Sequence, residues 1–371
     1  MNAWTVMLYL AGADDLEPYM AQALLALEEA GPPPGVEVIV QLFRAPGAAV
    51  ERALAPGRRP TEIDGDWAGA RRYRLRRRQA GASGDRFASE LLADLGAAAG
   101  PADPKVLGNF VADALSRFPA ERSLLLISGH GMGFCGITLD LVTGPQPATM
   151  TIRALAAALR RLERRPDILL LDACQMNSLD VITQFALPAP AAQVLIAPAS
   201  HAPRAGLDYT VLLGALGGHS TTEAAALTAG ALERAAGLQV LAFRLDVPAW
   251  RAVTRAARSA DGPGYLPMYA EAARACIHPG AGQRLRLLVT WPNPVDFPAR
   301  YHHLYQRLQF ARRSGWGRML QPTAGPSPAR ERLAPVTVPA PLLHAWLQIL
   351  RRDLSPQQVA LLLESLRWSG S

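Results

Sequence analysis

Short apolar runs alternate with longer amphipathic stretches through the first half of the chain. The apolar runs at residues 4–10 and 36–43 have the length of strands. The stretch between them, residues 15–30, has the spacing of a helix and is followed by three consecutive prolines. Such alternation is typical of a parallel sheet flanked by helices. The pattern therefore predicts an α/β fold for this half.

Two further apolar runs are continuous, which is typical of strands buried on both faces of a sheet. They lie at residues 124–127 and 168–171, and a similar run at residues 194–197 predicts another central strand. A Gly-, Pro- and Arg-rich stretch at residues 45–84 predicts a surface excursion with one hairpin around Tyr73. The helices predicted in this half are residues 15–30, 87–98, 105–118 and 152–164.

The second half has a different pattern, which becomes mainly helical after about residue 220. Strands are predicted at residues 239–245 and 285–290, and a helix near residues 301–312. We therefore predict an α/β domain at residues 1–220 and a mainly helical C-terminal extension at residues 221–371 that packs on it. The extension is the expected place for regulation or for docking of a partner.

Composition narrows the class of protein. Half of the 371 residues are apolar, enough for a substantial core. No apolar run approaches the roughly 20 residues that span a bilayer, and the N-terminus shows no basic leader, so we expect no membrane span and a cytoplasmic location. Cys135, Cys174 and Cys276 are scattered without C-x-x-C spacing. This argues against a disulfide framework or a metal cluster and leaves a single active thiol open.

The basic balance of the chain raises the question of nucleic-acid binding. The formal charge is +7 and the pI is near 9.8. Lys105 is the sole lysine, and an Arg bias of this kind also arises in GC-rich genomes. Six arginines within residues 71–78 form either a solvated strand edge that discourages further pairing or a phosphate-binding patch. We favour the solvated edge and do not expect nucleic acid as a partner.

Two polar segments follow successive buried strands. The segment SGHGMG, residues 128–133, follows the first continuous run, and the segment DACQM, residues 172–176, follows the next. In an open parallel sheet, neighbouring strands deliver the residues after their carboxyl ends to the same rim. We therefore expect His130 and Cys174 to meet although 44 residues separate them.

A thiol beside an imidazole can attack a carbonyl carbon. A free thiol is largely protonated near neutral pH, and His130 could stabilise the thiolate or protonate a leaving amine. Glycines around His130 allow a substrate to approach, so the amides of Gly131 and Cys174 are candidates for binding the developing oxyanion. Taken separately, a histidine between glycines is often an ordinary loop residue, and a cysteine after an apolar strand is often a buried core residue. Their joint placement favours a catalytic pair.

Several motifs in a fixed order agree with one known family. They are WTVMLYL (residues 4–10), ADDLE (13–17), VQL (40–42), RY (72–73), FPA (118–120), HGMGF (130–134) and DACQM (172–176). In these motifs, over roughly residues 3–220, the chain resembles the clostripain-like cysteine peptidases, relatives of the caspases. The resemblance implies a caspase-like three-layer sandwich with a mostly parallel central sheet, and it implies His130 and Cys174 as the catalytic dyad.

The resemblance also implies a pocket for the substrate residue before the scissile bond, the P1 residue. In these peptidases the Asp two positions before the nucleophile lies at the base of this S1 pocket and favours Arg or Lys, and Asp172 occupies that position. Its alternative role is to cap the following turn. The family's usual acidic pair after the next strand is replaced by Ser200 and His201. Both are candidates for the S1 pocket, and a surface loop is the alternative for His201.

Together these expectations predict an intracellular cysteine endopeptidase that cleaves protein substrates after Arg or Lys and requires no metal or organic cofactor. Asp14, Asp15 and Glu17 could be imagined as calcium ligands, but a helix N-terminus favours acidic residues there equally well. A cytoplasmic peptidase needs restraint, so we expect a regulatory protein or activator, and analogy with caspase-like enzymes suggests a bacterial defence role. The alternative is a catalytically silent caspase-like scaffold.

Overall fold

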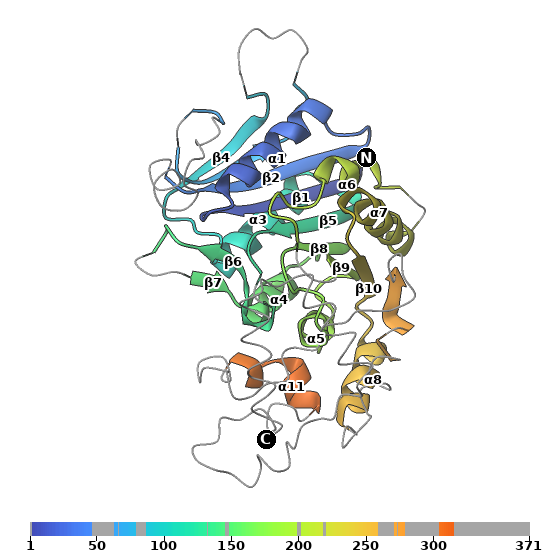
Figure 1. The fold of residues 1–371 in the computed structure, drawn as a ribbon. Helices are drawn as coiled ribbons and strands as arrows, with labels where there is room; N and C mark the ends of the chain where they lie inside the picture. The colour runs from blue at the N-terminus through green and yellow to red at the C-terminus, as the bar shows by residue number, and fades with distance from the viewer. Residues whose placement is uncertain are drawn as a thin grey trace.

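The computed structural model describes most of the first 258 residues and short segments beyond them (Figure 1). The described residues are 2–46, 63–65, 67–78, 87–131, 133–144, 148–198, 202–217, 220–258, 271–272, 274–278 and 304–314. The strand predicted at residues 285–290 and the two S1 candidates Ser200 and His201 lie outside them.

A nine-stranded sheet forms the centre of the described structure, in the order β11-β10-β9-β8-β5-β1-β2-β3-β4. The middle strands, from β9 to β2, run parallel, and the outer strands pair antiparallel. The strands are β1 (Asn2–Gly12), β2 (Val36–Arg44), β3 (Gly69–Arg74), β4 (Glu90–Gly96), β5 (Ala120–Ser128), β8 (Ile168–Asp172), β9 (Val194–Pro198), β10 (Val240–Arg244) and β11 (Cys276–His278). The predicted mostly parallel α/β sheet is confirmed.

Helices cover both faces of the sheet and complete a three-layer sandwich (Figure 1). On β1, Met7 and Tyr9 face one apolar cluster, whereas Val6 and Leu8 face the other, because successive side chains of a strand point to opposite faces. The first cluster packs against α3 (Pro104–Arg117), α4 (Ile152–Arg161), α5 (Leu179–Ala186), α8 (Val247–Arg258) and α11 (Gln309–Ser314); the second packs against α1 (Glu17–Ala30), α6 (Tyr209–Gly214) and α7 (Thr221–Ala236).

The helix predicted at residues 87–98 is wrong, because β4 occupies this segment at the edge of the sheet. Leu91, Leu92 and Leu95 have helical spacing, yet Leu91 and Leu95 are 45% and 37% exposed. Pairing with β3 decides the conformation instead, since charged side chains of β4 meet arginines of β3.

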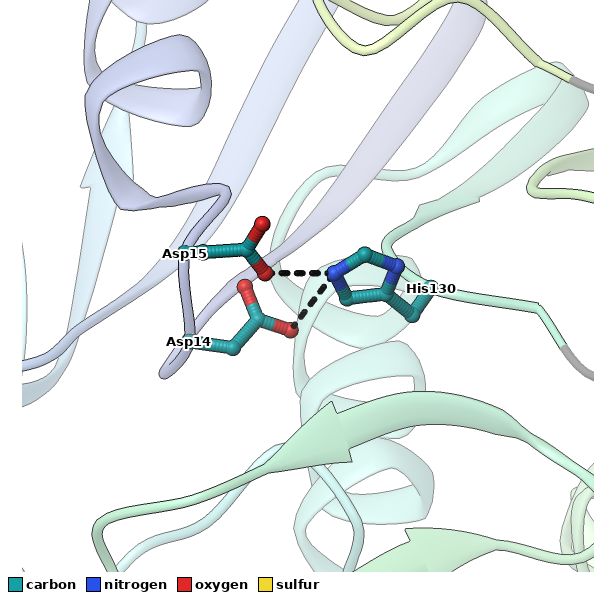
Figure 2. A group of neighbouring side chains, drawn as sticks. All are labelled: Asp14, Asp15 and His130. Carbon is teal, nitrogen blue, oxygen red and sulfur yellow. Dashed lines mark hydrogen bonds and ion pairs between the residues drawn. The ribbon is translucent and has the colours of Figure 1, made fainter. Parts of the chain in front are cut away.

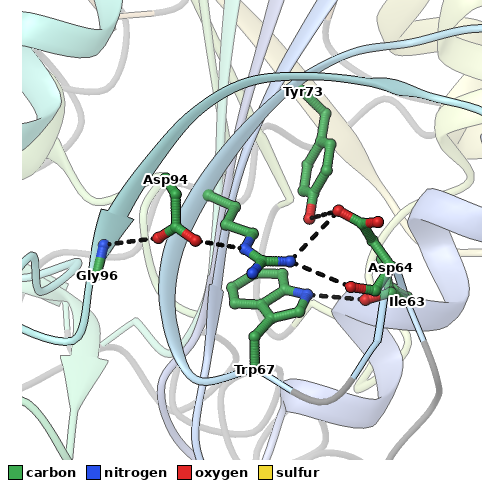
Figure 3. A network of polar contacts seen from close by, with 7 residues as sticks. Ile63, Asp64, Trp67, Tyr73, Asp94 and Gly96 are labelled. Carbon is green, nitrogen blue, oxygen red and sulfur yellow. Dashed lines mark hydrogen bonds and ion pairs between the residues drawn. The ribbon is translucent and has the colours of Figure 1, made fainter.

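The arginine cluster of residues 71–78 is not a free edge, because β3 pairs with a strand on each side. Arg71 is an example of how nearby groups compensate the charges of this cluster, and its partners Asp64, Trp67 and Asp94 are labelled in Figure 3. Its Nε donates to Asp94 at 2.9 Å, its Nη1 lies 3.3 Å from an Asp64 carboxylate oxygen, and its guanidinium lies over the Trp67 ring. The prediction of a solvated edge is therefore wrong, since β4 pairs with the outer side of β3 and its Asp94 pairs with Arg71.

Neighbouring arginines of this cluster also have acidic partners. Arg72, only 6% exposed, donates to Asp113 at 2.6 Å, and Arg74 donates to Glu37 through two nitrogens at 2.7 Å. Paired guanidinium groups are less available to phosphates than free ones, because their charge is already neutralised. The remaining pairs are Arg76 with Glu90 and Arg78 with Glu28.

The sheet continues past the domain boundary predicted after residue 220, since β10 and β11 lie beyond it. α7 packs on the same sheet through the second apolar cluster. The division into two domains stays a prediction, because residues 315–371 and most of 259–303 lie outside the described part. No described helix is long and apolar enough to cross a membrane.

Candidate active site

Three loops meet at the carboxyl ends of β1, β5 and β8, which are neighbours in the sheet. The register pairs Leu10 with Ser128 and Ser128 with Asp172, so these strands end at the same level. The chain segments that follow them therefore gather at one rim, where open parallel sheets place their sites. A cleft at this rim is lined by Leu16, Met20, Ser128, Gly129, His130, Asp172, Cys174, Ala202, Pro203, Arg204 and Gly206.

His130 and Cys174 both line this cleft, as their positions after successive strands predict. The main chain beside His130 is packed directly on the main chain of Cys174. A Cβ atom at Gly131 would lie 2.3 Å from the carbonyl oxygen of Cys174 and 2.8 Å from its nitrogen. Only glycine allows this approach, so the residue type at 131 brings the two loops together.

A small hairpin formed by β6 (Ile137–Asp140) and β7 (Ala148–Met150) holds the His130 loop from the other side. The Thr138 N–H donates to the His130 carbonyl at 2.9 Å, and Gly131 forms a bridge with Ile137. Thr138 has a φ of 59°, a costly conformation for a β-branched residue, and its hydroxyl donates to the buried carbonyl of Pro101 at 3.0 Å. The His130 backbone is thus fixed by several contacts.

Two carboxylates from the loop after β1 point at the His130 ring (Figure 2). Oδ1 of Asp15 lies 2.6 Å from Nε2 of His130, and Oδ2 of Asp14 lies 4.0 Å from the same nitrogen. The other Asp15 oxygen accepts from Arg204 at 2.5 Å. Asp14 and Asp15 therefore do more than favour a helix N-terminus, because both contact the ring of His130.

The two carboxyl groups differ in their electrostatics. Burial raises the pKa of Asp14 to about 7, although the Leu16 N–H and the nearby His130 oppose this. Burial would also raise the pKa of Asp15, but hydrogen bonds from His130 and Arg204 outweigh it, so the pKa of Asp15 falls below its usual value. Asp15 is therefore a carboxylate at neutral pH and a permanent acceptor for the His130 ring.

Cys174 is half-buried and begins a tight turn after β8. Burial raises the pKa of its thiol, and a hydrogen bond from the Ala202 N–H lowers it only in part. The next residue, Gln175, has a φ of 61°, a left-handed conformation that is uncommon outside glycine. The resting sulfur is thus a neutral thiol held on a strained turn.

Asp172 lines the cleft, and 2% of its surface is exposed. One oxygen, Oδ2, accepts from the Leu207 N–H at 2.9 Å, the Tyr209 hydroxyl at 2.8 Å and the Ser128 hydroxyl at 3.3 Å. The other, Oδ1, is buried and has no hydrogen-bond partner among the described residues. Burial raises the pKa of Asp172, and those three hydrogen bonds lower it in part. The Oδ2 partners come from other segments of the cleft, which argues against a role in capping the following turn.

The contact between His130 and the two aspartates and the position of Arg204 were not predicted from the sequence. The rule that placed His130 beside Cys174 applies equally to the segment after β1, because β1 is the other neighbour of β5. Residues 13–17 could have been placed at the same rim from that rule. Arg204 lies in an irregular segment after β9, and no pattern in the sequence marks it.

One group of side chains in the described structure could hold a metal ion, namely Asp14, Asp15 and His130. Their ligand atoms lie within 4.8 Å of one another. Glu17, which could be imagined as a third acidic ligand, is instead paired with Arg44 at 2.6 Å in a buried ion pair. The calcium set considered from the sequence is therefore wrong in its third member.

Comparison with known proteins agrees with the observed fold. The fold is similar to that of a secreted C11 cysteine protease from Bacteroides thetaiotaomicron in complex with an irreversible peptide inhibitor. The TM-score is 0.61 and the sequence identity is 16%, and the match covers 85% of this chain and 99% of that one. It is similar to an inactive zymogen C11 protease from Parabacteroides distasonis, with a TM-score of 0.60 and 14% identity over the same shares. No curated protein matches the chain. The model of the clostripain family matches residues 9–233, so the chain belongs to this family of cysteine peptidases.

Proposed function

We propose that the chain is an endopeptidase that cleaves protein substrates after Arg or Lys, with Cys174 as nucleophile and His130 as the group that moves the proton. One observation carries this proposal: Cys174, His130 and Asp172 line a single cleft, and one buried oxygen of Asp172 has no hydrogen-bond partner among the described residues. A nucleophile, a base and a buried anion in one cleft are the parts that cleavage beside a basic residue requires.

Asp15 defines which nitrogen of His130 is free. A carboxylate 2.6 Å from Nε2 favours the tautomer that carries its proton on Nε2. The lone pair of Nδ1 is then available to accept the thiol proton. Asp15 also stabilises the imidazolium that forms when this proton arrives, so we assign it as a positioning residue.

The neutral thiol determines the order of events. As the Cys174 sulfur attacks the scissile carbonyl carbon, its proton passes to His130. The tetrahedral intermediate collapses to a thioester, and the imidazolium gives the proton to the leaving amine. A water molecule then attacks the thioester carbonyl, again losing a proton to His130, which returns it to the sulfur as the acid product leaves. Each proton is returned, and the chain ends as it began.

Backbone amides are the candidates for stabilising the oxyanion. The N–H groups of Gly131 and Cys174 belong to two main-chain segments in close contact, so both can be directed at one substrate oxygen. Removing one such donor from an acyl-transfer enzyme typically lowers the rate by about 10²–10³. A side chain at position 131 would separate these amides, which is a second reason for glycine there.

Asp172 is the proposed specificity residue. Its Oδ1 atom is buried without a partner among the described residues, which is costly for a carboxylate unless a cation arrives to satisfy it. The guanidinium of Arg or the ammonium of Lys at P1 would supply that partner. Ser200 and His201 lie outside the described residues, and their part in the S1 pocket stays a prediction.

The site of action and its control also stay predictions. A cytoplasmic enzyme restrained by a regulatory protein or activator, with a role in bacterial defence, is what the sequence suggested. The similar protease from Bacteroides thetaiotaomicron is described as secreted. Membership of the family is therefore compatible with action outside the cell.

A peptide-library cleavage profile tests the proposal. Purified wild-type protein should cut after Arg and Lys, and Cys174→Ala should not cut at all. Asp172→Ala should retain the fold and lose the preference for a basic P1 residue. Cleavage that persists in Cys174→Ala would remove the proposed nucleophile, and a wild-type profile without basic P1 residues would remove the proposed role of Asp172.

A further inference from the structure

We propose that Asp14, Asp15 and His130 form a binding site for a first-row divalent cation such as Zn²⁺, and that the bound ion inhibits the peptidase. Binding of the ion follows from the geometry of the three side chains and from the chemistry of their nitrogen and oxygen atoms. The inhibitory part rests on the function proposed above, because it requires His130 to move protons.

The separations among the three side chains suit one small ion. His130 Nε2 lies 2.6 Å from Asp15 Oδ1 and 4.0 Å from Asp14 Oδ2. Two donors that bind one Zn²⁺ at about 2.1 Å in tetrahedral geometry lie about 3.4 Å apart. The two observed separations fall on either side of this value. A displacement of the imidazole by less than about 1 Å, away from Asp15 and toward Asp14, would equalise them.

Asp14 supplies an independent reason to expect a cation. Its side chain is completely buried, and its Oδ2 atom, on the side facing His130, accepts no hydrogen bond from the described residues. Leaving a buried carboxylate oxygen without a donor costs free energy. A metal ion between Asp14 and His130 would satisfy this oxygen.

The remaining oxygens of both carboxylates are already held by other groups. Asp14 Oδ1 accepts from the Leu16 N–H at 2.8 Å, and Asp15 Oδ2 accepts from Arg204. Outer partners of this kind orient metal ligands and strengthen binding. Each carboxylate therefore offers one oriented oxygen to the ion.

The donor set also indicates the class of ion. One imidazole nitrogen and two carboxylate oxygens leave a fourth position of a tetrahedron for water, a pattern typical of Zn²⁺ sites that are open to solvent. Ca²⁺ prefers six to eight oxygen ligands, which these residues cannot supply. The side chains of His130 and Asp15 are 35% and 22% exposed, so an ion can reach the site from solvent.

Inhibition follows from the chemistry of the imidazole ring. An ion bound at Nε2 displaces the proton from that nitrogen, and a neutral ring must then carry its proton on Nδ1. Nδ1 can no longer accept the proton of Cys174, so attack by the sulfur stops. Removing the ion returns the proton to Nε2 and restores the acceptor.

Metal binding and activity can be measured separately on the untagged full chain. Co²⁺ serves as a spectroscopic probe, Zn²⁺ displaces it, and four proteins are compared: wild type, Asp14→Asn, Cys174→Ser and the exposed control Asp94→Asn. We expect one ion per chain in the wild type and unchanged affinity in Cys174→Ser and Asp94→Asn. Affinity should fall about tenfold or more in Asp14→Asn, since loss of even an outer partner weakens metal sites by about 10–100-fold.

The zinc concentration for half inhibition, measured relative to each protein's own metal-free rate, should rise in Asp14→Asn by the same factor as the dissociation constant. Equal affinity in the wild type and Asp14→Asn would overturn the site, as would a thiolate-to-cobalt charge-transfer band that vanishes in Cys174→Ser. If the enzyme cleaves no peptide, the cobalt series still decides the site. If it cleaves and binds zinc without loss of rate, the inhibitory role is wrong and the site stands.

Discussion

Oδ1 of Asp15 lies 2.6 Å from Nε2 of His130, which gives the imidazole that we propose as catalytic an acidic partner from the loop after β1 (Figure 2). The partner comes from the strand on the opposite side of β5 from Cys174. Three neighbouring strands thus each contribute one group to a proposed Asp–His–Cys relay.

Replacement of Asp15 by Asn tests this relay. The amide keeps the shape but can place its NH₂ toward the ring, which favours the wrong tautomer and removes the charge that stabilises the imidazolium. We expect kcat to fall on the order of 10²-fold with little change in KM, because general acid–base catalysis contributes about 10²–10⁴-fold in all. Steady-state kinetics on an Arg-P1 peptide measures both constants.

The matched control for Asp15→Asn is Arg204→Ala, which leaves the contact between Asp15 and His130 in place. Arg204 is 68% exposed and donates to Oδ2 of Asp15, the oxygen that does not face His130, so a loss of kcat below about tenfold is expected. Equal losses in the two variants would show that Asp15 does not act through the ring.

Asp172→Asn should remove the negative charge proposed to bind the P1 side chain while keeping a polar side chain of the same size. We expect kcat/KM for an Arg-P1 substrate to fall about 10²–10³-fold, since losing one partner of a buried charge pair costs about 2–5 kcal/mol. A citrulline-P1 substrate, which has the shape of arginine without its charge, is the control. The wild type should strongly prefer arginine over citrulline, and the variant should not. A preference that survives in Asp172→Asn would assign specificity to another group.

Gly131→Ala should place a methyl group against the backbone of Cys174, where the nearest atom is 2.3 Å away. Because backbone cannot yield as a flexible side chain does, we expect unfolding free energy to fall by about 1–3 kcal/mol and activity to be lost. Gly108→Ala is the control, since nothing lies within 4 Å of its added Cβ and alanine is the better helix former by about 1 kcal/mol. If urea unfolding shows that Gly131→Ala is as stable as Gly108→Ala, the close approach of Gly131 to the Cys174 backbone is contradicted.

Asp180→Asn tests the electrostatics of the core. Burial raises the pKa of Asp180 to about 6, so between about pH 4 and 6 the folded state binds more protons than the unfolded state. Its contribution to stability therefore decreases as pH rises through this window, by on the order of 2–3 kcal/mol. Asn carries no such charge, so the variant should gain stability relative to wild type as pH rises from 4 to 7. Urea unfolding of both proteins at several pH values measures this difference. If the unfolding free energies of the wild type and the variant change with pH in parallel, Asp180 is not the source of the pH dependence.

The parallel sheet and the position of His130 and Cys174 on one cleft could be predicted from sequence, because continuous apolar runs and the polar residues after them leave few other arrangements. The β4 strand could not, because its leucines have helical spacing and the arginines of β3 decide its conformation. The role of Asp15 was missed for a different reason. Acidic residues before a helix have an ordinary local explanation, and only the position of β1 beside β5 reveals a distant partner.

The most direct measurement is covalent labelling with an arginyl chloromethyl ketone followed by peptide mass spectrometry. We expect one adduct per chain, on Cys174, with labelling slowed in His130→Ala and in Asp172→Asn. An adduct on Cys135 or Cys276, or labelling of Cys174→Ser at the wild-type rate, would contradict it.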